Sequence, residues 1–138
     1  MLLRRILVVD DNEDDLFFAQ IILKAARVAV DLSLAPTGQA ALDGLAGPAG
    51  REVDAILLDI NMPEMSGFEF LDRYQPLYEQ GVVAAPVVML TSSSDRADRA
   101  RAQAYGCVKG YWVKPMSRQQ AQALPDLLGP PRRLGDAP

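Results

Sequence analysis

The 138-residue sequence contains no histidine, and this absence limits the chemistry available to the chain. Without imidazole there is no Ser-His or Cys-His nucleophile pair, so hydrolases of the triad type are excluded. The single cysteine, Cys107, cannot form an internal disulfide. Zinc sites of the finger or His-carboxylate kind are excluded as well. Any metal ion bound by this chain must therefore have oxygen ligands.

The sequence also lacks long apolar segments and a basic charge balance. Its longest apolar run, residues 82–90, is interrupted by Pro86 and is about half of the roughly 18 residues that a membrane-spanning helix needs. The basic residues near the N-terminus are not followed by the apolar stretch of a signal peptide, so we expect a cytoplasmic protein. With 14 basic against 18 acidic residues, nucleic acid is not an expected partner.

The residues that are present suit one packed domain. Hydrophobic residues make up 49% of the chain and charged residues 23%, which is ordinary for a globular domain of this length. Only the C-terminal end changes character, because four prolines and two glycines follow Leu124. We therefore expect a packed domain over residues 1–124 and a proline-rich C-terminal arm over residues 125–138.

Short apolar runs alternate along the chain with segments of helical period. The expected strands are residues 6–9, 30–35, 53–58, 86–90 and 111–113. The expected helices begin near Asp14, Thr37, Ser66, Asp95 and Ser117. This alternation predicts a doubly wound α/β fold with a five-stranded parallel sheet. Because only residues 30–34 alternate polar with apolar, as at a sheet edge, the pattern favours the flavodoxin-like strand order 2-1-3-4-5.

Polar side chains follow four of the expected strands. Asp10 and Asp11 follow the first strand, and Asp59 follows the third. Thr91 and Lys114 end the fourth and fifth. Each alone has an ordinary reading as a helix cap, a turn residue or a solvated charge. Because the carboxyl ends of parallel strands share one rim of the sheet, where ligands bind, their coincidence favours a functional site there.

Three carboxylates at one rim need a compensating cation. At about 4 Å, like charges repel by up to ~4 kcal/mol per pair at an effective dielectric near 20. Ligands that are all oxygen favour Mg²⁺, with Mn²⁺ as a substitute. Because a carboxylate also serves as a nucleophile in phosphoryl transfer, the pattern suggests an aspartyl phosphate.

Five short segments, in order and with ordinary spacing, resemble the receiver domain of two-component response regulators. They are residues 6–11 (ILVVDD), 57–63 (LLDINMP), 66–67 (SG), 89–91 (MLT) and 110–115 (GYWVKP). The resemblance covers roughly residues 4–124. The long connection between Pro76 and Pro86 is further similar to single-domain regulators that partner bacterial phytochrome histidine kinases.

The resemblance implies a role for each acidic residue of the rim. Asp59 matches the family's phosphoacceptor. Asp10 and Asp11 match its acidic Mg²⁺ pair, and Asn61 matches the position whose backbone carbonyl is a metal ligand. Together with Asp59, these residues form the metal site that the resemblance implies.

Three further residues match the family's catalytic and switching positions. Thr91 matches the hydroxyl that turns toward the phosphoryl group, and Lys114 matches its ammonium partner. Tyr111 matches the aromatic switch that moves inward on activation, although a half-buried strand tyrosine is the plain alternative. The resemblance also implies a cis peptide bond between Lys114 and Pro115.

The function implied is that of a single-domain response regulator. It accepts a phosphoryl group from a sensor histidine kinase onto Asp59 with Mg²⁺, and signals by contact with a downstream protein or by phosphorelay to a phosphotransfer domain. It would catalyse only its own phosphorylation and dephosphorylation. Two alternatives stay open: a haloacid-dehalogenase-type phosphatase, whose Asp-x-Asp pair would here be Asp10 and Asn12, and a pseudo-receiver that serves only for dimerisation.

Two prolines depart from the family pattern. Pro76 is expected to end or kink the third helix early, and Pro125 to limit the last helix to about two turns. The shortened helix would leave a face open beside the fourth helix and fifth strand. We expect a homodimer on this face with exchanged C-terminal arms, in which Arg132 and Arg133 pair with acidic groups of the partner.

Overall fold

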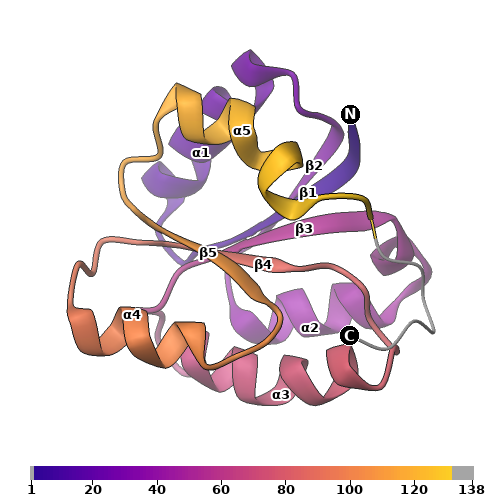
Figure 1. The fold of residues 1–138 in the computed structure, drawn as a ribbon, viewed down its shortest axis with the longest axis vertical. Coiled ribbons are helices and arrows are strands. Elements are labelled where there is room, and N and C mark those ends of the chain that lie inside the picture. Colours follow the sequence, from indigo (N-terminus) through magenta and orange to yellow (C-terminus); the bar gives the residue numbers. More distant parts are fainter. Residues whose placement is uncertain (1, 132–138) are drawn as a thin grey trace.

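The computed structural model describes residues 2–131, and within them five strands alternate with five α-helices (Figure 1). The strands are β1 (Leu3–Val9), β2 (Ala29–Ala35), β3 (Val53–Leu58), β4 (Val87–Thr91) and β5 (Val108–Val113). The α-helices are α1 (Glu13–Ala26), α2 (Gly38–Ala46), α3 (Gly67–Glu79), α4 (Arg96–Gln103) and α5 (Arg118–Leu128). A short 3-10 helix, η1 (Pro48–Glu52), lies between α2 and β3. Each element expected from the sequence is present.

All strand pairs are parallel, and the order is β2-β1-β3-β4-β5, which confirms the predicted doubly wound topology. Figure 1 shows α1 and α5 on one face of the sheet and α2, α3 and α4 on the other. The central strand β3 is buried at every residue, whereas the edge strand β2 is exposed at several positions. The alternation of polar and apolar residues in β2 is therefore that of an edge strand.

The sheet separates two hydrophobic clusters. Successive strand residues point to opposite faces, so Leu57 packs in the cluster beneath α1 and α5, while Ile56 and Leu58 pack in the cluster beneath the other helices. All three side chains are fully buried. This two-sided burial explains why the central strands are continuously apolar in the sequence.

Each α-helix begins just after a side chain that accepts a hydrogen bond from a backbone amide of its first turn. These capping residues are Asn12, Thr37, Ser66, Asp95 and Ser117. Four of them are the residues near which the sequence predicted a helix start. The first helix begins one residue before the expected Asp14, because Asn12 accepts a hydrogen bond from the Asp15 amide at 3.0 Å.

Pro76 was expected to end or kink the third helix early. It does not end the helix, because α3 continues to Glu79. Tyr74 and Tyr78, on either side of the proline, are buried in the core. The Tyr74 hydroxyl also donates a 2.7 Å hydrogen bond to the Ala85 carbonyl. Burial of these two rings offsets the backbone hydrogen bond that proline removes.

The expectation that the last helix would stop near residue 124 was also wrong. The helix α5 passes through Pro125 to Leu128, where the Gly129 amide bonds to the Pro125 carbonyl at 3.1 Å. Leu124 and Pro125 are buried, and Leu128 packs on the same cluster. The apolar contacts of the last turn therefore compensate for the missing amide.

The longer helix covers part of the surface that the sequence left open. A Cβ atom placed on Gly110 of β5 would lie 3.1 Å from Cδ2 of Leu127, so the last turn of α5 packs directly over this strand. Among residues 2–131, we find no helix whose length and apolar content would let it span a bilayer.

Burial along α5 makes a direct prediction. Leu124 is 0% exposed and Leu127 is 43% exposed, although they are only three positions apart. Replacing Leu124 with Ala should lower the free energy of unfolding by about 2 to 5 kcal/mol, because it leaves a cavity in the core. Leu127→Ala should cost less than about 1 kcal/mol. Urea denaturation followed by circular dichroism measures both, and equal losses would contradict this orientation of α5.

Candidate functional site

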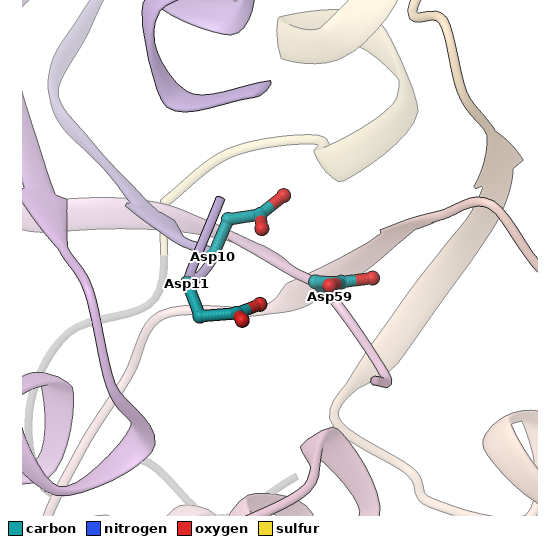
Figure 2. A group of neighbouring side chains, drawn as sticks. All are labelled: Asp10, Asp11 and Asp59. Carbon is teal, nitrogen blue, oxygen red and sulfur yellow. The ribbon is translucent and has the colours of Figure 1, made fainter. Parts of the chain in front are cut away.

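Three carboxylates meet at the carboxyl ends of neighbouring strands. Asp10 and Asp11 follow β1 and Asp59 follows β3, which pairs with β1. One oxygen from each lies within 4.8 Å of the others. Figure 2 shows the three side chains extending to the same side of the strand ends. Asp10 and Asp59 are buried, whereas Asp11 is exposed. The rim expected from the sequence therefore forms.

Buried polar side chains in the described residues concentrate at this rim. Asp10, Asp59 and Thr91 lie there, and the remaining one is Asp54, near the opposite end of the sheet. The carboxylate of Asp54 is paired with Arg4 through contacts as short as 2.7 Å. The charge of Asp54 is therefore balanced by Arg4. At the rim, by contrast, several carboxylates share the single ammonium of Lys114.

Lys114 brings the positive charge to the rim from the end of β5. Its Nζ atom lies 2.6 Å from Oδ2 of Asp10 and 2.8 Å from Oδ2 of Asp15. The distance to Oδ1 of Asp59 is 3.7 Å. The peptide bond between Lys114 and Pro115 is cis, as expected. Sequence elements more than one hundred residues apart are thus joined by one ammonium group.

Sequence reasoning missed Asp15. This residue belongs to an acidic first turn of α1 with Glu13 and Asp14, and such turns are common because negative charge is favourable at a helix N-terminus. Only its position, five residues after Asp10, could have indicated that Asp15 lies near the site. The contact with Lys114 depends on how α1 packs against α5, which that spacing does not encode.

The surroundings raise the pKa values of both Asp59 and Lys114. Burial raises the pKa of Asp59, and the neighbouring negative charge of Asp10 raises it further, against the opposing effects of Lys114, Thr91 and the Ile60 amide. For Lys114, burial lowers the pKa, but hydrogen bonds to Asp10 and Asp15 and the charge of Asp59 outweigh this and raise it. A further cation beside Asp59 would offset the electrostatic repulsion between Asp59 and Asp10.

The loop after β3 is held close to the Asp59 side chain. The Ile60 amide donates to Oδ1 of Asp59 at 2.9 Å, and the Gly67 amide donates to the Ile60 carbonyl at 2.8 Å. A Cβ on Gly67 would lie only 2.4 Å from the Asp59 carbonyl oxygen, so this position requires glycine. Asn61 follows Ile60 in the sequence and is exposed.

Thr91 and Tyr111 are connected through Ser93. Thr91 is fully buried at the end of β4, and its hydroxyl oxygen accepts a hydrogen bond from the Ser93 amide at 3.3 Å. The Tyr111 hydroxyl donates to the Ser93 carbonyl at 2.9 Å. The ring of Tyr111 is buried, with the Arg99 guanidinium 4.6 Å from its centroid. Tyr111 therefore lies in an inward position.

The donor set fits Mg²⁺. The ligands available are oxygens of Asp10, Asp11 and Asp59, with neither imidazole nor thiolate in the cluster. Lys114 balances only part of the negative charge, since it also pairs with Asp15. The site can therefore accept a hard divalent ion together with a small anionic group.

Comparisons with known proteins agree with this geometry. Residues 6–124 match the family described as the response regulator receiver domain. A two-component response regulator from Cytophaga hutchinsonii has a TM-score of 0.81 at 28% identity, over 93% of this chain and 98% of that one. The bacteriophytochrome response regulator RtBRR is 30% identical with a TM-score of 0.75, over 94% of this chain and 80% of that one.

Curated relatives are matched over only part of their length. A probable cyclic di-GMP phosphodiesterase of Vibrio cholerae is 36% identical over 81% of this chain, which corresponds to 23% of that protein. The transcriptional regulatory protein SpaR of Bacillus subtilis is 32% identical over 86% of this chain and 49% of its own length. The chain thus spans less than half of these relatives. By its match over residues 6–124 and its fold, the chain belongs to the response regulator receiver domain family.

Proposed function

We propose that this chain accepts a phosphoryl group from a histidine of a sensor kinase onto Asp59. The observation that carries the proposal is the buried Asp59 carboxylate, which ends a central strand within reach of Lys114 and of two further carboxylates. Receiver domains pair with histidine kinases. The likeness to bacteriophytochrome response regulators supports a phytochrome-type kinase as the partner.

The reaction is an in-line transfer. An oxygen of Asp59 forms a bond to phosphorus while the bond from phosphorus to the kinase imidazole nitrogen breaks, and the electron pair leaves with the imidazole. The Ile60 amide holds the Asp59 carboxylate at 2.9 Å, and Lys114 supplies positive charge to the transferred group. Asp10, Asp11, Asp59 and the Asn61 backbone carbonyl would hold Mg²⁺ or Mn²⁺, which would supply positive charge to the phosphoryl group.

The response to phosphorylation runs through Thr91 and Tyr111. In this proposal the Thr91 hydroxyl turns toward the phosphoryl group, which changes its hydrogen bond with Ser93. The Tyr111 hydroxyl binds the carbonyl of the same serine, and its ring already lies inward, the position that the resemblance assigns to activation. In this proposal phosphorylation favours that inward position through Ser93. The output is contact with a downstream protein or phosphorelay, and we assign the chain no catalysis beyond its own phosphorylation and dephosphorylation.

Neither alternative function gains support. A dehalogenase-type phosphatase would use position 12 as its acid-base group. Here the Asn12 side chain accepts a hydrogen bond from the Asp15 amide and caps α1. A dimerisation module without phosphorylation would not need buried carboxylates around a lysine, which are costly to hold without a function.

Replacing the acceptor tests the proposal. Asp59→Asn should abolish the mass increase that acetyl phosphate and Mg²⁺ produce in the wild-type chain, because the amide is not a nucleophile. Intact mass spectrometry measures the increase. Asp54→Asn, which changes the buried carboxylate paired with Arg4, serves as a control and should still be labelled. Labelling of Asp59→Asn at the wild-type rate would exclude Asp59 as the acceptor.

Mg²⁺ should stabilise the folded chain, because it relieves repulsion among the carboxylates and binds only their native arrangement. The melting temperature should rise with Mg²⁺ concentration in the wild type. Asp11→Ala should remove this rise, while Asp126→Ala, an exposed change on α5, should preserve it. A wild-type melting temperature that does not change with Mg²⁺ concentration would contradict the metal site.

We also propose a homodimer on the face formed by α4, β5 and α5. Arg132 and Arg133, which were expected to pair with the partner, lie outside the described residues. Light scattering should give a dimer mass for the full chain and a monomer mass for a chain that ends at Gly129, which preserves α5. The same mass for both would exclude a role for the C-terminal arm.

A further inference from the structure

The two shortest contacts of the Lys114 ammonium are not with Asp59. Hydrogen bonds join Nζ to Asp10 at 2.6 Å and to Asp15 at 2.8 Å, whereas Oδ1 of Asp59 is 3.7 Å away. The side chain of Lys114 is only 15% exposed, so its position is well determined by these neighbours. Asp15 thus holds the ammonium on the α1 side of the acceptor.

Asp15 is itself fixed by a closed ring of hydrogen bonds. The Asn12 amide donates to Oδ1 of Asp10 at 3.0 Å, and the Asp15 amide donates to the Asn12 side chain at 3.0 Å. The Lys114 ammonium then joins Oδ2 of Asp15 to Oδ2 of Asp10. The N-cap of α1 therefore sets the place of the Asp15 carboxylate, and that carboxylate sets the place of the ammonium.

From this ring we infer that Asp15 is a positioning residue for Lys114 and keeps the ammonium from closing onto Asp59. Without Asp15, the nearest remaining partners of the ammonium are Asp10 and Asp59. The ammonium would then move across the gap to Asp59 and compete with a divalent cation for both carboxylates. The inference deepens the proposed function and rests on it, since it concerns the same metal and phosphoacceptor site.

Mg²⁺ binding provides a measure that does not depend on phosphorylation. Calorimetric titration of Asp15→Ala with Mg²⁺ should give a dissociation constant about threefold to tenfold above that of Asp14→Ala, the size expected for partly exposed charges. Asp14 is the matched control, since it is the preceding residue, is exposed, and forms no ion pair with Lys114 in the described residues. Asp15→Glu should restore much of the affinity.

A double-mutant cycle separates positioning from the simple loss of a charge. If Asp15 acts through the ammonium, adding Asp15→Ala to Lys114→Met should leave the Mg²⁺ affinity of the single Lys114→Met variant unchanged. A further loss of the same size as in the wild-type background would overturn the inference. Melting curves check that each variant is folded, and Asp15→Glu gives a second comparison if one is not.

The wild-type chain distinguishes the two levels of the proposal. A wild type that binds no Mg²⁺ and takes no phosphoryl group from acetyl phosphate refutes the proposed function and this inference with it. A wild type that does both, while Asp15→Ala matches Asp14→Ala in Mg²⁺ affinity, refutes only the positioning role of Asp15.

Discussion

The structure depends on keeping two buried carboxylates, those of Asp10 and Asp59, close together with little access to water. Asp10 and Asp59 end neighbouring strands, and both are buried. Burial and the neighbouring charge of Asp10 both disfavour the ionised form of Asp59, so an opposite charge is required. Lys114 meets this need from β5, which lies at the edge of the sheet. The ion pair between Lys114 and Asp10 joins the ends of the first and last strands at one rim. One ammonium does not balance all the carboxylates there, so the rim keeps negative charge that a cation can neutralise.

The two faces of the sheet support this rim in different ways. On the α1 side, the ring through Asn12 and Asp15 fixes the loop after β1 and the lysine together. On the other side, Gly67 permits α3 to begin against the Asp59 carbonyl, and Ser93 connects Thr91 with Tyr111. The Asp59 carboxylate therefore lies between the ion pairs of Lys114 on one side and the loop that contains Ser93 on the other.

The relatives show the same domain in proteins of different description. The chain matches part of a probable cyclic di-GMP phosphodiesterase, of a histidine kinase of Arabidopsis thaliana and of a transcriptional regulatory protein. A site built wholly from strand ends and their loops is complete within one sheet. A domain whose candidate site lies within one sheet can therefore occur in proteins of different description.

The sequence by itself determined the fold class, the strand order and the convergence of Asp10, Asp11, Asp59, Thr91 and Lys114. Continuous apolar runs define buried parallel strands, and the residue after each run must lie at the carboxyl rim. These are local signals that repeat along the chain, so they survive without knowledge of packing.

Only the tertiary structure decided where α3 and α5 end and which carboxylate Lys114 contacts. Proline weakens a helix locally, but the burial of Tyr78 and Leu124 contributes more than one lost hydrogen bond, and burial depends on the whole core. The pairing of Asp15 with Lys114 joins residues 99 positions apart. It exists because α1 packs against α5, which places the start of α1 near the residue that follows β5. No spacing in the sequence records this relation between surfaces.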